Sequence, residues 1–209
     1  MTLDGNTAAI DNDFTGHLVE AHLDDDHLAE LLKVIFSELD LSIVMHPLVY
    51  EYELLKDKPR ITMLFDCGIV NKAEFTDIHQ DDPVKKSYYA FLVANLYRDL
   101  RGESLPLSGE DIFTRWLRRV SLGEVHSVAM CLICGCGIFL SDDGDSKVLQ
   151  NLIKDKALGN VSVYNRKELV DVHLKQGQTK IPRKERHFLA HSKSYTIPAF
   201  RAILTKSGN

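Results

Sequence analysis

Short apolar runs alternate along the chain with longer segments in which apolar residues recur at the spacing of one helix face. The clearest example of this helical spacing is formed by Leu28, Leu31, Leu32, Ile35 and Leu39. The short runs predict strands at Thr7–Ile10, Leu41–Met45, Ile138–Leu140 and Val161–Tyr164. The longer segments predict helices at Phe14–Leu23, His27–Leu39, Val84–Leu100, Ile112–Val120, Ser146–Lys156 and Arg166–Leu174.

The alternation of strands and helices predicts an α/β protein with three layers. A mostly parallel sheet would form the central layer, and helices would cover both of its faces. A further helix is expected to begin at Pro47, whereas the stretch Ile61–Val70 fits either a strand or a short buried helix. The acid-rich segment Thr76–Pro83 is expected to be a loop.

The stretch Gly123–Asp145 predicts a helix, a tight turn and a strand that ends in a group of acids. Its acidic residues are Glu124 at the start of the helix and Asp142, Asp143 and Asp145 after the strand. Ligands of open α/β sheets bind at the carboxyl ends of the strands, and carboxylates gathered there are typical of a divalent-metal site. Any one of these acids alone is better explained as a loop residue or helix cap, so only the joint pattern supports a site.

Two further acidic positions could complete such a site. Asp11 directly follows the first predicted strand. Glu51 and Glu53 lie in the helix expected after Pro47, and residues two apart on a helix do not face the same way. At most one of these two glutamates can therefore point into a shared site, and the sequence leaves both possibilities open.

The composition is that of a globular protein of 209 residues, with 44% hydrophobic and 26% charged residues. No apolar run reaches the roughly 18 residues of a membrane span, and the first residues do not resemble a secretory signal. We therefore expect no membrane association and a cytoplasmic location. Three of the four cysteines crowd into a CLICGC segment among apolar neighbours, which favours buried packing over a zinc site; they are Cys131, Cys134 and Cys136, with Cys67 apart.

The net charge of −5 conceals a basic C-terminal part. From Arg166 onward there are ten Lys or Arg and three Asp or Glu, while the preceding residues carry 15 basic and 27 acidic side chains. A basic extension on an acidic body indicates a polyanionic partner or docking of the extension on the body. The candidate phosphate-binding residues are Arg115, Arg118 and Arg119 around Trp116, and Arg183, Lys184 and Arg186 in the extension. For the three arginines near Trp116, an ordinary solvated face is the simpler interpretation.

Three segments together resemble the PIN domain, the metal-dependent ribonuclease fold of VapC-type toxins and related nucleases. AAIDNDF resembles the opening hydrophobic-Asp element, and LGEVHSVAMCLICGCGIFLSDDGD resembles the helix, strand and acidic turn of that family. NVSVYNRKELVDVHLKQG resembles the closing strand and helix. The resemblance implies a PIN-like domain over residues 1–176, with a middle helical insertion at 58–109, followed by a basic C-terminal extension at 177–209.

The resemblance also implies roles for individual acids. Asp11 matches the first metal ligand, and the helix acid is Glu51 or Glu53. Glu124 stands where many members have Asp, and Asp143 matches the last acid, with Asp142 and Asp145 as close neighbours. Asp13 falls where the family often has a polar residue beside the site. The expected catalytic set is Asp11, Glu51, Glu124 and Asp143, and Glu53 and Asp142 are further candidate ligands.

The implied activity is hydrolysis of RNA phosphodiesters with one or two Mg²⁺ or Mn²⁺ ions, which lower the pKa of water and hold the phosphate oxygens. The implied partners are an RNA substrate, an antitoxin protein and a second copy of the chain in a homodimer. Two alternatives stay open. One is an inactive PIN-like domain that binds nucleic acid or protein, and the other is a metal-dependent phosphatase or DNA nuclease, because acid clusters at strand ends occur in several such folds.

Overall fold

The computed structural model describes residues 3, 5–19, 25–54 and 59–175. The C-terminal extension at 177–209, with the candidate phosphate-binding residues Arg183, Lys184 and Arg186, lies outside the described residues. Among the helices described, none is both long and apolar enough to cross a membrane.

Five described strands form one parallel sheet in the order β3-β2-β1-β4-β5. Their bounds are Thr7–Ile10 for β1, Ser42–Met45 for β2, Asn71–Lys72 for β3, Ile138–Leu140 for β4 and Ser162–Tyr164 for β5. The first strand lies in the centre, so that Ala8 is paired with Ile43 of β2 on one side and Ile138 of β4 on the other. The expected three-layer α/β/α architecture is confirmed.

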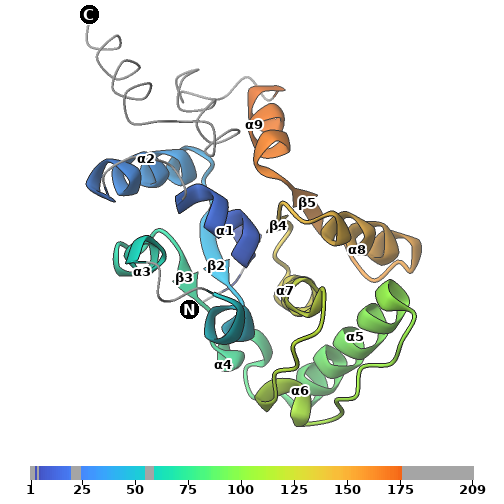
Figure 1. Ribbon diagram of the computed structural model, residues 1–209. Helices are drawn as coiled ribbons and strands as arrows, with labels where there is room; N and C mark the ends of the chain where they lie inside the picture. The colour runs from blue at the N-terminus through green and yellow to red at the C-terminus, as the bar shows by residue number, and fades with distance from the viewer. Residues whose placement is uncertain (1–2, 4, 20–24, 55–58, 176–209) are drawn as a thin grey trace, which may run out of the picture.

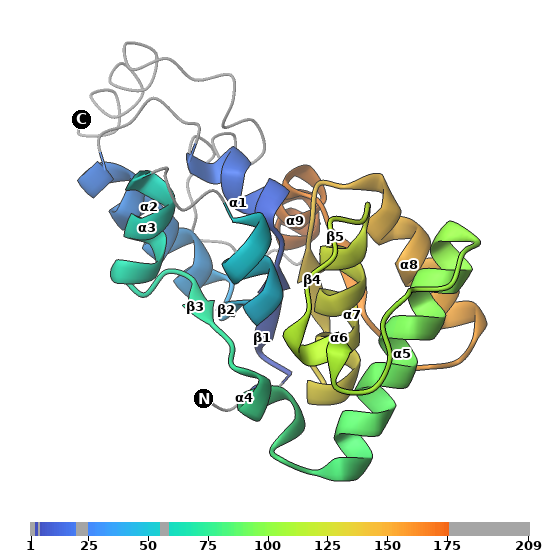
Figure 2. The same ribbon diagram turned by 60° about the horizontal axis from the view of Figure 1, so that its bottom comes forward.

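Helices cover both faces of the sheet (Figures 1 and 2). Successive strand residues point to opposite faces, and accordingly Ala8 and Ile10 belong to one core while Ala9 belongs to the other. The first core is covered by α1 (Asn12–Val19), α2 (Asp25–Glu38), α3 (Pro59–Asp66) and α9 (Arg166–Lys175). The second core is covered by α4 (Phe75–His79), α5 (Pro83–Arg101), α6 (Asp111–Thr114), α7 (Leu122–Cys134) and α8 (Gly144–Asp155).

The segment 58–109, expected as an insertion, contributes to both the sheet and the core of the described fold. Its first eight described residues form α3, which resolves the open choice between helix and strand for the stretch that begins at Ile61. The segment then supplies the edge strand β3 and the long helix α5. From α5, Leu92 and Val93 are fully buried in the second core. Removing this segment would therefore expose buried residues of the second core.

The expected loop at Thr76–Pro83 is wrong, because the structure has the short helix α4 there. Glu74 and Asp77 form a reciprocal capping box, in which each side chain accepts the backbone N–H of the other residue. Left-handed backbone at Gln80 then ends the helix. The abundance of acids that suggested a solvated loop thus reflects helix capping.

The expected helix at Ile112–Val120 is also wrong. The helix α6 ends at Thr114, and the backbone at Arg115 is extended, with φ −121° and ψ 116°. An extended chain covers about 3.3 Å per residue, against about 1.5 Å in a helix. The extended conformation therefore lets a few residues connect the end of α6 to the start of α7 at Leu122. The basic strip expected on one helical face, formed by Arg115, Arg118 and Arg119, does not exist in that form.

Candidate functional site

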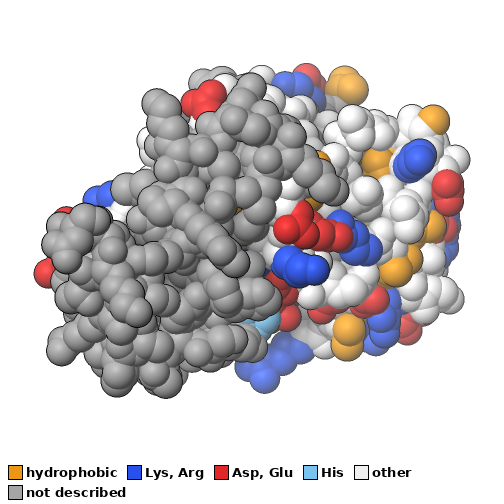
Figure 3. All heavy atoms as spheres, turned by 90° about the horizontal axis from the view of Figure 1, so that it is seen from above, with side chains coloured by type: hydrophobic (Ala, Val, Ile, Leu, Met, Phe, Trp, Pro, Cys, Tyr) orange, Lys and Arg blue, Asp and Glu red, His pale blue; other side chains and the backbone are white. Residues whose placement is uncertain are grey.

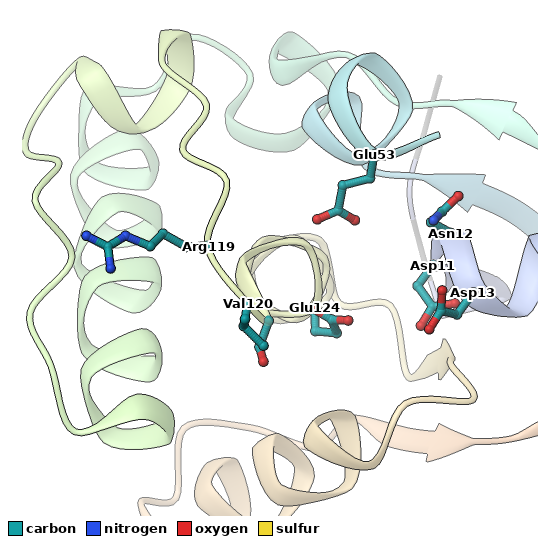
Figure 4. A pocket seen from close by; sticks show the side chains of 8 residues that line it. Asp11, Asn12, Asp13, Glu53, Arg119, Val120 and Glu124 are labelled. Atoms are coloured by element: carbon teal, nitrogen blue, oxygen red, sulfur yellow. The ribbon is translucent and has the colours of Figure 1, made fainter. Parts of the chain in front are cut away.

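A pocket of about 340 Å³ opens at the carboxyl edge of the sheet, next to the first turn of α7. Acidic side chains carried by three separate segments point toward it (Figure 4). The lining residues are Asp11, Asn12, Asp13, Glu53, Arg119, Val120, Ser121 and Glu124. The structure thus brings Asp11, Glu53 and Glu124 together, although they lie far apart in the sequence.

Asp11 reaches the pocket because it directly follows the central strand β1. Its backbone N–H continues the sheet by donating to the Leu140 carbonyl at 3.1 Å. Its Oδ1 accepts the N–H of Phe14 at 2.7 Å, which caps the start of α1. The hydroxyl of Thr15, one residue further along α1, donates to the Asp11 carbonyl at 2.6 Å.

The second carboxylate oxygen of Asp11 makes no such bond. Asp11 is only 3% exposed, and its Oδ2 has no hydrogen-bond partner among the described residues. Burial raises the pKa of Asp11 well above its ordinary value, and the negative charges of Glu124 and Asp13 raise it further, whereas the Ser141 hydroxyl and the Phe14 N–H oppose that change. A buried acceptor without a partner costs roughly 1–3 kcal/mol, which a cation or proton at Oδ2 would offset.

Glu53 ends a π-helical turn, η1 (Val49–Glu53), which follows strand β2. Its carboxylate lies against the first turn of α7 and accepts the N–H of Gly123. Ser121 precedes α7 but makes no side-chain cap, since its hydroxyl donates to Asp145 of α8. Glu53 therefore takes the place of a local capping residue. Negative charge is favourable at this position because unpaired N–H groups gather at the start of a helix.

Glu124 lies in the first turn of α7, facing the same pocket. Burial raises the pKa of Glu124 to about 7, and the nearby charges of Asp143, Asp13 and Asp145 raise it further against the effect of its own backbone N–H. Burial also raises the pKa of Glu53 to about 7, with further increases from Glu124 and Asp13. The pocket therefore holds carboxylates that repel one another when ionised, and a bound divalent cation would relieve that repulsion.

The choice left open between Glu51 and Glu53 is resolved by the geometry of the π-helical turn. The Glu51 carboxylate lies 2.6 Å from Nζ of Lys72 on the edge strand, and Glu51 does not line the pocket. Of the two glutamates, the structure therefore places Glu53 at the pocket and Glu51, expected in the catalytic set, away from it. Residues two apart on the turn point in different directions, so only one of these two glutamates reaches α7.

The acids after β4 do not all belong to the pocket. Asp142 lies 2.6 Å from both His17 Nδ1 and Arg166 Nε. Burial alone would raise the pKa of Asp142, but these two partners outweigh burial and lower it. Asp142 thus ties α1 to α9, and its expected role as a metal ligand is not supported by its position. Asp145 accepts from Ser121 and lies 3.2 Å from Arg101.

Asp143 has an intermediate position. Its Oδ1 accepts the N–H of Asp145 at 2.7 Å and caps α8. It does not line the pocket, yet its charge raises the pKa of Glu124. The charge of Asp143 therefore affects Glu124 in the pocket, while one of its carboxylate oxygens, Oδ1, is hydrogen-bonded in the cap of α8.

The basic residues near the pocket are dispersed. Arg119 belongs to the pocket wall, but its side chain points away (Figure 4) and lies 3.5 Å from Glu103. Arg115 and Arg118 are exposed and make no ion pair with a described residue. On the face seen from above, acidic and basic side chains are intermixed among the described residues (Figure 3).

A buried polar network holds α7 against the sheet. The Tyr89 hydroxyl lies 2.7 Å from His46 Nε2 at the end of β2 and 2.6 Å from His126 Nδ1 in α7. The Leu48 N–H donates to His46 Nδ1, so His46 Nε2 carries the proton and donates to Tyr89, which in turn donates to His126. Burial lowers the pKa of His126 to about 3. The network is therefore neutral, and it fixes the helix that carries Glu124.

The chemistry of the pocket fits a hard divalent cation such as Mg²⁺ or Mn²⁺. The donors are carboxylate oxygens, which these ions prefer, and Asp11 Oδ2 is buried without a partner. No three Asp, Glu, His or Cys side chains in the described ranges are already arranged as a coordination group. Mg²⁺ usually keeps several of its waters and binds through one or two carboxylates, so an open arrangement of this kind is compatible with it.

Sequence reasoning missed several residues around the pocket. The sequence marks Gly123 only as the start of the acidic segment, whereas its missing side chain makes room for Glu53. The Asn12 and Ser121 side chains line the pocket without any sequence signal that marks them. A glycine in the first turn of a predicted helix was the one usable clue, because glycine is unfavourable there unless another group must approach the backbone.

The chain was also compared with known proteins. No model of a protein family, no curated protein and no solved structure matches it. The fold and the geometry of the pocket are therefore the grounds on which its function is inferred.

Proposed function

We propose that this chain is a metal-dependent ribonuclease with a PIN-like fold, which hydrolyses RNA phosphodiesters at the pocket of Asp11, Glu53 and Glu124. The observation that carries the proposal is the buried, unpartnered Oδ2 of Asp11 beside two further carboxylates. A cation held there would lower the pKa of a water molecule and neutralise charge on the phosphate.

Each acid has a distinct task in the proposal. Asp11 would hold the cation most firmly, because burial and the helix cap fix the position of its side chain. Glu53 and Glu124 have pKa values of about 7, so either can take up or release a proton near neutral pH. Together they would bind the cation in their ionised forms and orient the water for attack.

A second candidate function is a nucleic-acid-binding module that does not cleave. It is favoured by the fact that carboxylates of the region already have structural partners. Asp11 caps α1, Glu53 accepts the Gly123 N–H at the start of α7, and Asp143 caps α8. These interactions would persist in a protein that had lost its metal.

An RNA cleavage assay with a matched pair of variants tests the proposal. Labelled single-stranded RNA is incubated with the protein in Mg²⁺, in Mn²⁺ and in EDTA. We expect cleavage only with a divalent cation, and we expect Glu53→Gln and Asp11→Asn to abolish it. Asparagine caps a helix about as well as aspartate, so Asp11→Asn should leave α1 intact.

Glu51→Gln is the matched control, because it changes the same residue type two positions away. Glu51 is 43% exposed and contacts Lys72, so its substitution should preserve cleavage and cost at most about 1 kcal/mol of stability. Equal activity of Glu51→Gln and Glu53→Gln would contradict the proposed site. RNA binding without cleavage in either metal would support the binding module. Turnover of p-nitrophenyl phosphate but not of RNA would indicate a phosphatase.

A further inference from the structure

A stacked pair of aromatic rings, one exposed and one half-buried, lies close to the acidic pocket. The rings of Tyr52 and Trp116 are parallel to within 2°, and their centroids are 5.7 Å apart, which is the geometry of offset stacking. Tyr52 is 54% exposed even though it contacts Trp116. The ring of Tyr52 therefore offers a flat aromatic surface to the solvent, and the half-buried Trp116 supports it.

Chain connectivity places this surface close to the pocket, although neither ring is among the residues that line it. Tyr52 directly precedes Glu53, so their Cα atoms are about 3.8 Å apart. Trp116 lies three residues before Arg119, which with Val120 forms another part of the wall. Three residues of extended chain span at most about 11 Å. One bound strand could therefore contact both the aromatic pair and the carboxylates.

The aromatic pair is supported from below, so its position is set before any ligand binds. The ring of Trp116 lies 6.2 Å from the ring of His126, which is fully buried and hydrogen-bonded to Tyr89. Trp116 also packs against the second core. A surface that is already ordered loses little conformational entropy on binding, and this favours affinity.

The neighbouring charges suit a nucleic acid. Arg115 and Arg118 flank Trp116 in the sequence, are exposed and make no ion pair with a described residue. Their positive charge can attract phosphates to this side of the pocket, where the carboxylates alone would repel them. The simpler alternative is that Tyr52 only shields Trp116 from water.

We propose that Tyr52 and Trp116 form a stacking subsite for one unpaired base of the strand whose phosphodiester enters the pocket. The inference rests on the proposed function and specifies its substrate as single-stranded nucleic acid. Stacking of a base on an aromatic side chain contributes roughly 1–3 kcal/mol, and it tolerates any base because every base has a flat face.

Trp116 is the only tryptophan of the chain, so its emission reports directly on the subsite. The intact protein is titrated with a short oligouridylate in Ca²⁺, with recovery of the uncut strand checked afterwards. Parallel titrations use the DNA strand oligothymidylate, an abasic ribose-phosphate strand of equal length, and an RNA duplex. We expect the emission to change with the two single strands that carry bases, and neither with the abasic strand nor with the duplex.

Three variants complete the experiment. Tyr52→Ala should weaken oligouridylate binding roughly tenfold and leave binding of the abasic strand unchanged, whereas Tyr52→Phe should bind like the wild type. Tyr88→Ala is the matched control, because Tyr88 is also exposed and stacks on Phe91, but both residues belong to α5 and neither adjoins a pocket residue in the sequence. It should bind like the wild type. Thermal melting verifies that each variant is folded.

The outcomes separate the inference from the proposed function. Equal affinity of Tyr52→Ala and wild type for oligouridylate would overturn the inference, even if metal-dependent cleavage is observed. An equal effect of Tyr88→Ala would overturn it as well. Tyr52-dependent binding in a protein that cleaves nothing would uphold the subsite and reject the nuclease. Tighter binding of oligouridylate than of oligothymidylate in these titrations would show that the bound strand is RNA.

Discussion

A Cβ atom on Gly123 would lie 2.3 Å from Oε2 of Glu53 and 2.6 Å from its Oε1. Real Cβ contacts are never this short, so the carboxylate of Glu53 occupies space that only glycine leaves free. The first turn of α7 and the end of η1 are therefore matched to each other, and the pocket depends on that match.

Gly123→Ala should displace the side chain of Glu53 from the pocket and have little effect on the fold. The obstructed atoms are the far end of a flexible side chain, which can swing away, so we expect a loss of about 1 kcal/mol from the broken hydrogen bond. The free energy of Mn²⁺ binding should decrease by more than this loss of stability, because one carboxylate leaves the site. Isothermal titration with Mn²⁺ and thermal melting measure the two effects separately.

Gly16→Ala in α1 is the control for this substitution. A Cβ at Gly16 would meet nothing within 4 Å, and alanine is the better helix former. The control should raise the free energy of unfolding by roughly 0.5–1 kcal/mol and leave Mn²⁺ binding unchanged. Wild-type Mn²⁺ affinity in Gly123→Ala would contradict the role assigned to Glu53.

The metal-free protein should lose stability as the pH rises through the range in which Glu53 and Glu124 ionise. Both have pKa values raised from 4.5 to about 7, so the folded state binds more protons than the unfolded state between these values. The contribution of these two groups is fully present below about pH 4.5 and is lost as the pH rises through about 7. The buried His46 and His126 act in the opposite direction, because burial lowers their pKa values.

The double variant Glu53→Gln/Glu124→Gln isolates the effect of the glutamates. Relative to the wild type it should gain a few kcal/mol in free energy of unfolding between about pH 5 and about pH 8. Saturating Mn²⁺ should remove most of this difference by stabilising the wild type alone. Denaturant unfolding across that pH range, with and without Mn²⁺, measures both changes. Parallel curves for the two proteins without metal would show that the glutamates are not coupled to folding.

Asp142 and Asp143 are neighbours with different roles, and their asparagine variants should differ. Asp143→Asn should keep the cap of α8, because asparagine caps as well as aspartate, and should change stability by less than about 0.5 kcal/mol. It should also lower the pKa of Glu124 by removing a nearby negative charge. NMR titration of the glutamate carboxyl carbons follows that change.

Asp142→Asn should instead destabilise the protein by about 1–3 kcal/mol, because it weakens the bonds to His17 and Arg166 that join α1 to α9. Mn²⁺ affinity should remain at the wild-type level. A fall in Mn²⁺ affinity without loss of stability would reverse the roles given to Asp142 and Asp143.

Tyr89→Phe should destabilise the protein by about 2 kcal/mol or more, since it leaves His46 and His126 without their shared partner in the core. Tyr97→Phe is the control, because the Tyr97 hydroxyl donates to the half-exposed Glu103 and water can replace it there. Its cost should be below about 1 kcal/mol. Equal midpoints of urea unfolding for the two variants would contradict the importance of the buried network.

Helical periodicity and apolar runs were sufficient to predict the α/β class and strands β1, β2, β4 and β5 to within a residue at each end. These features are local, because each depends on residues that are neighbours in the chain. The two segments predicted with the wrong secondary structure are those in which helix capping or the need to connect two helices sets the backbone conformation. Phe75–His79 is helical through its capping box, and the chain after Thr114 is extended because it must reach α7.

The sequence by itself determined which acids follow the strands, since the carboxyl ends of parallel strands share one edge of the sheet. It could not determine which carboxylates meet there. Only the tertiary structure directs Glu53 onto Gly123 while Glu51 pairs with Lys72, and only it commits Asp142 to His17 and Arg166. The physical reason is that side-chain direction depends on partners distant in the sequence. A capping N–H, an ion pair and a missing Cβ are each supplied by another element of the fold.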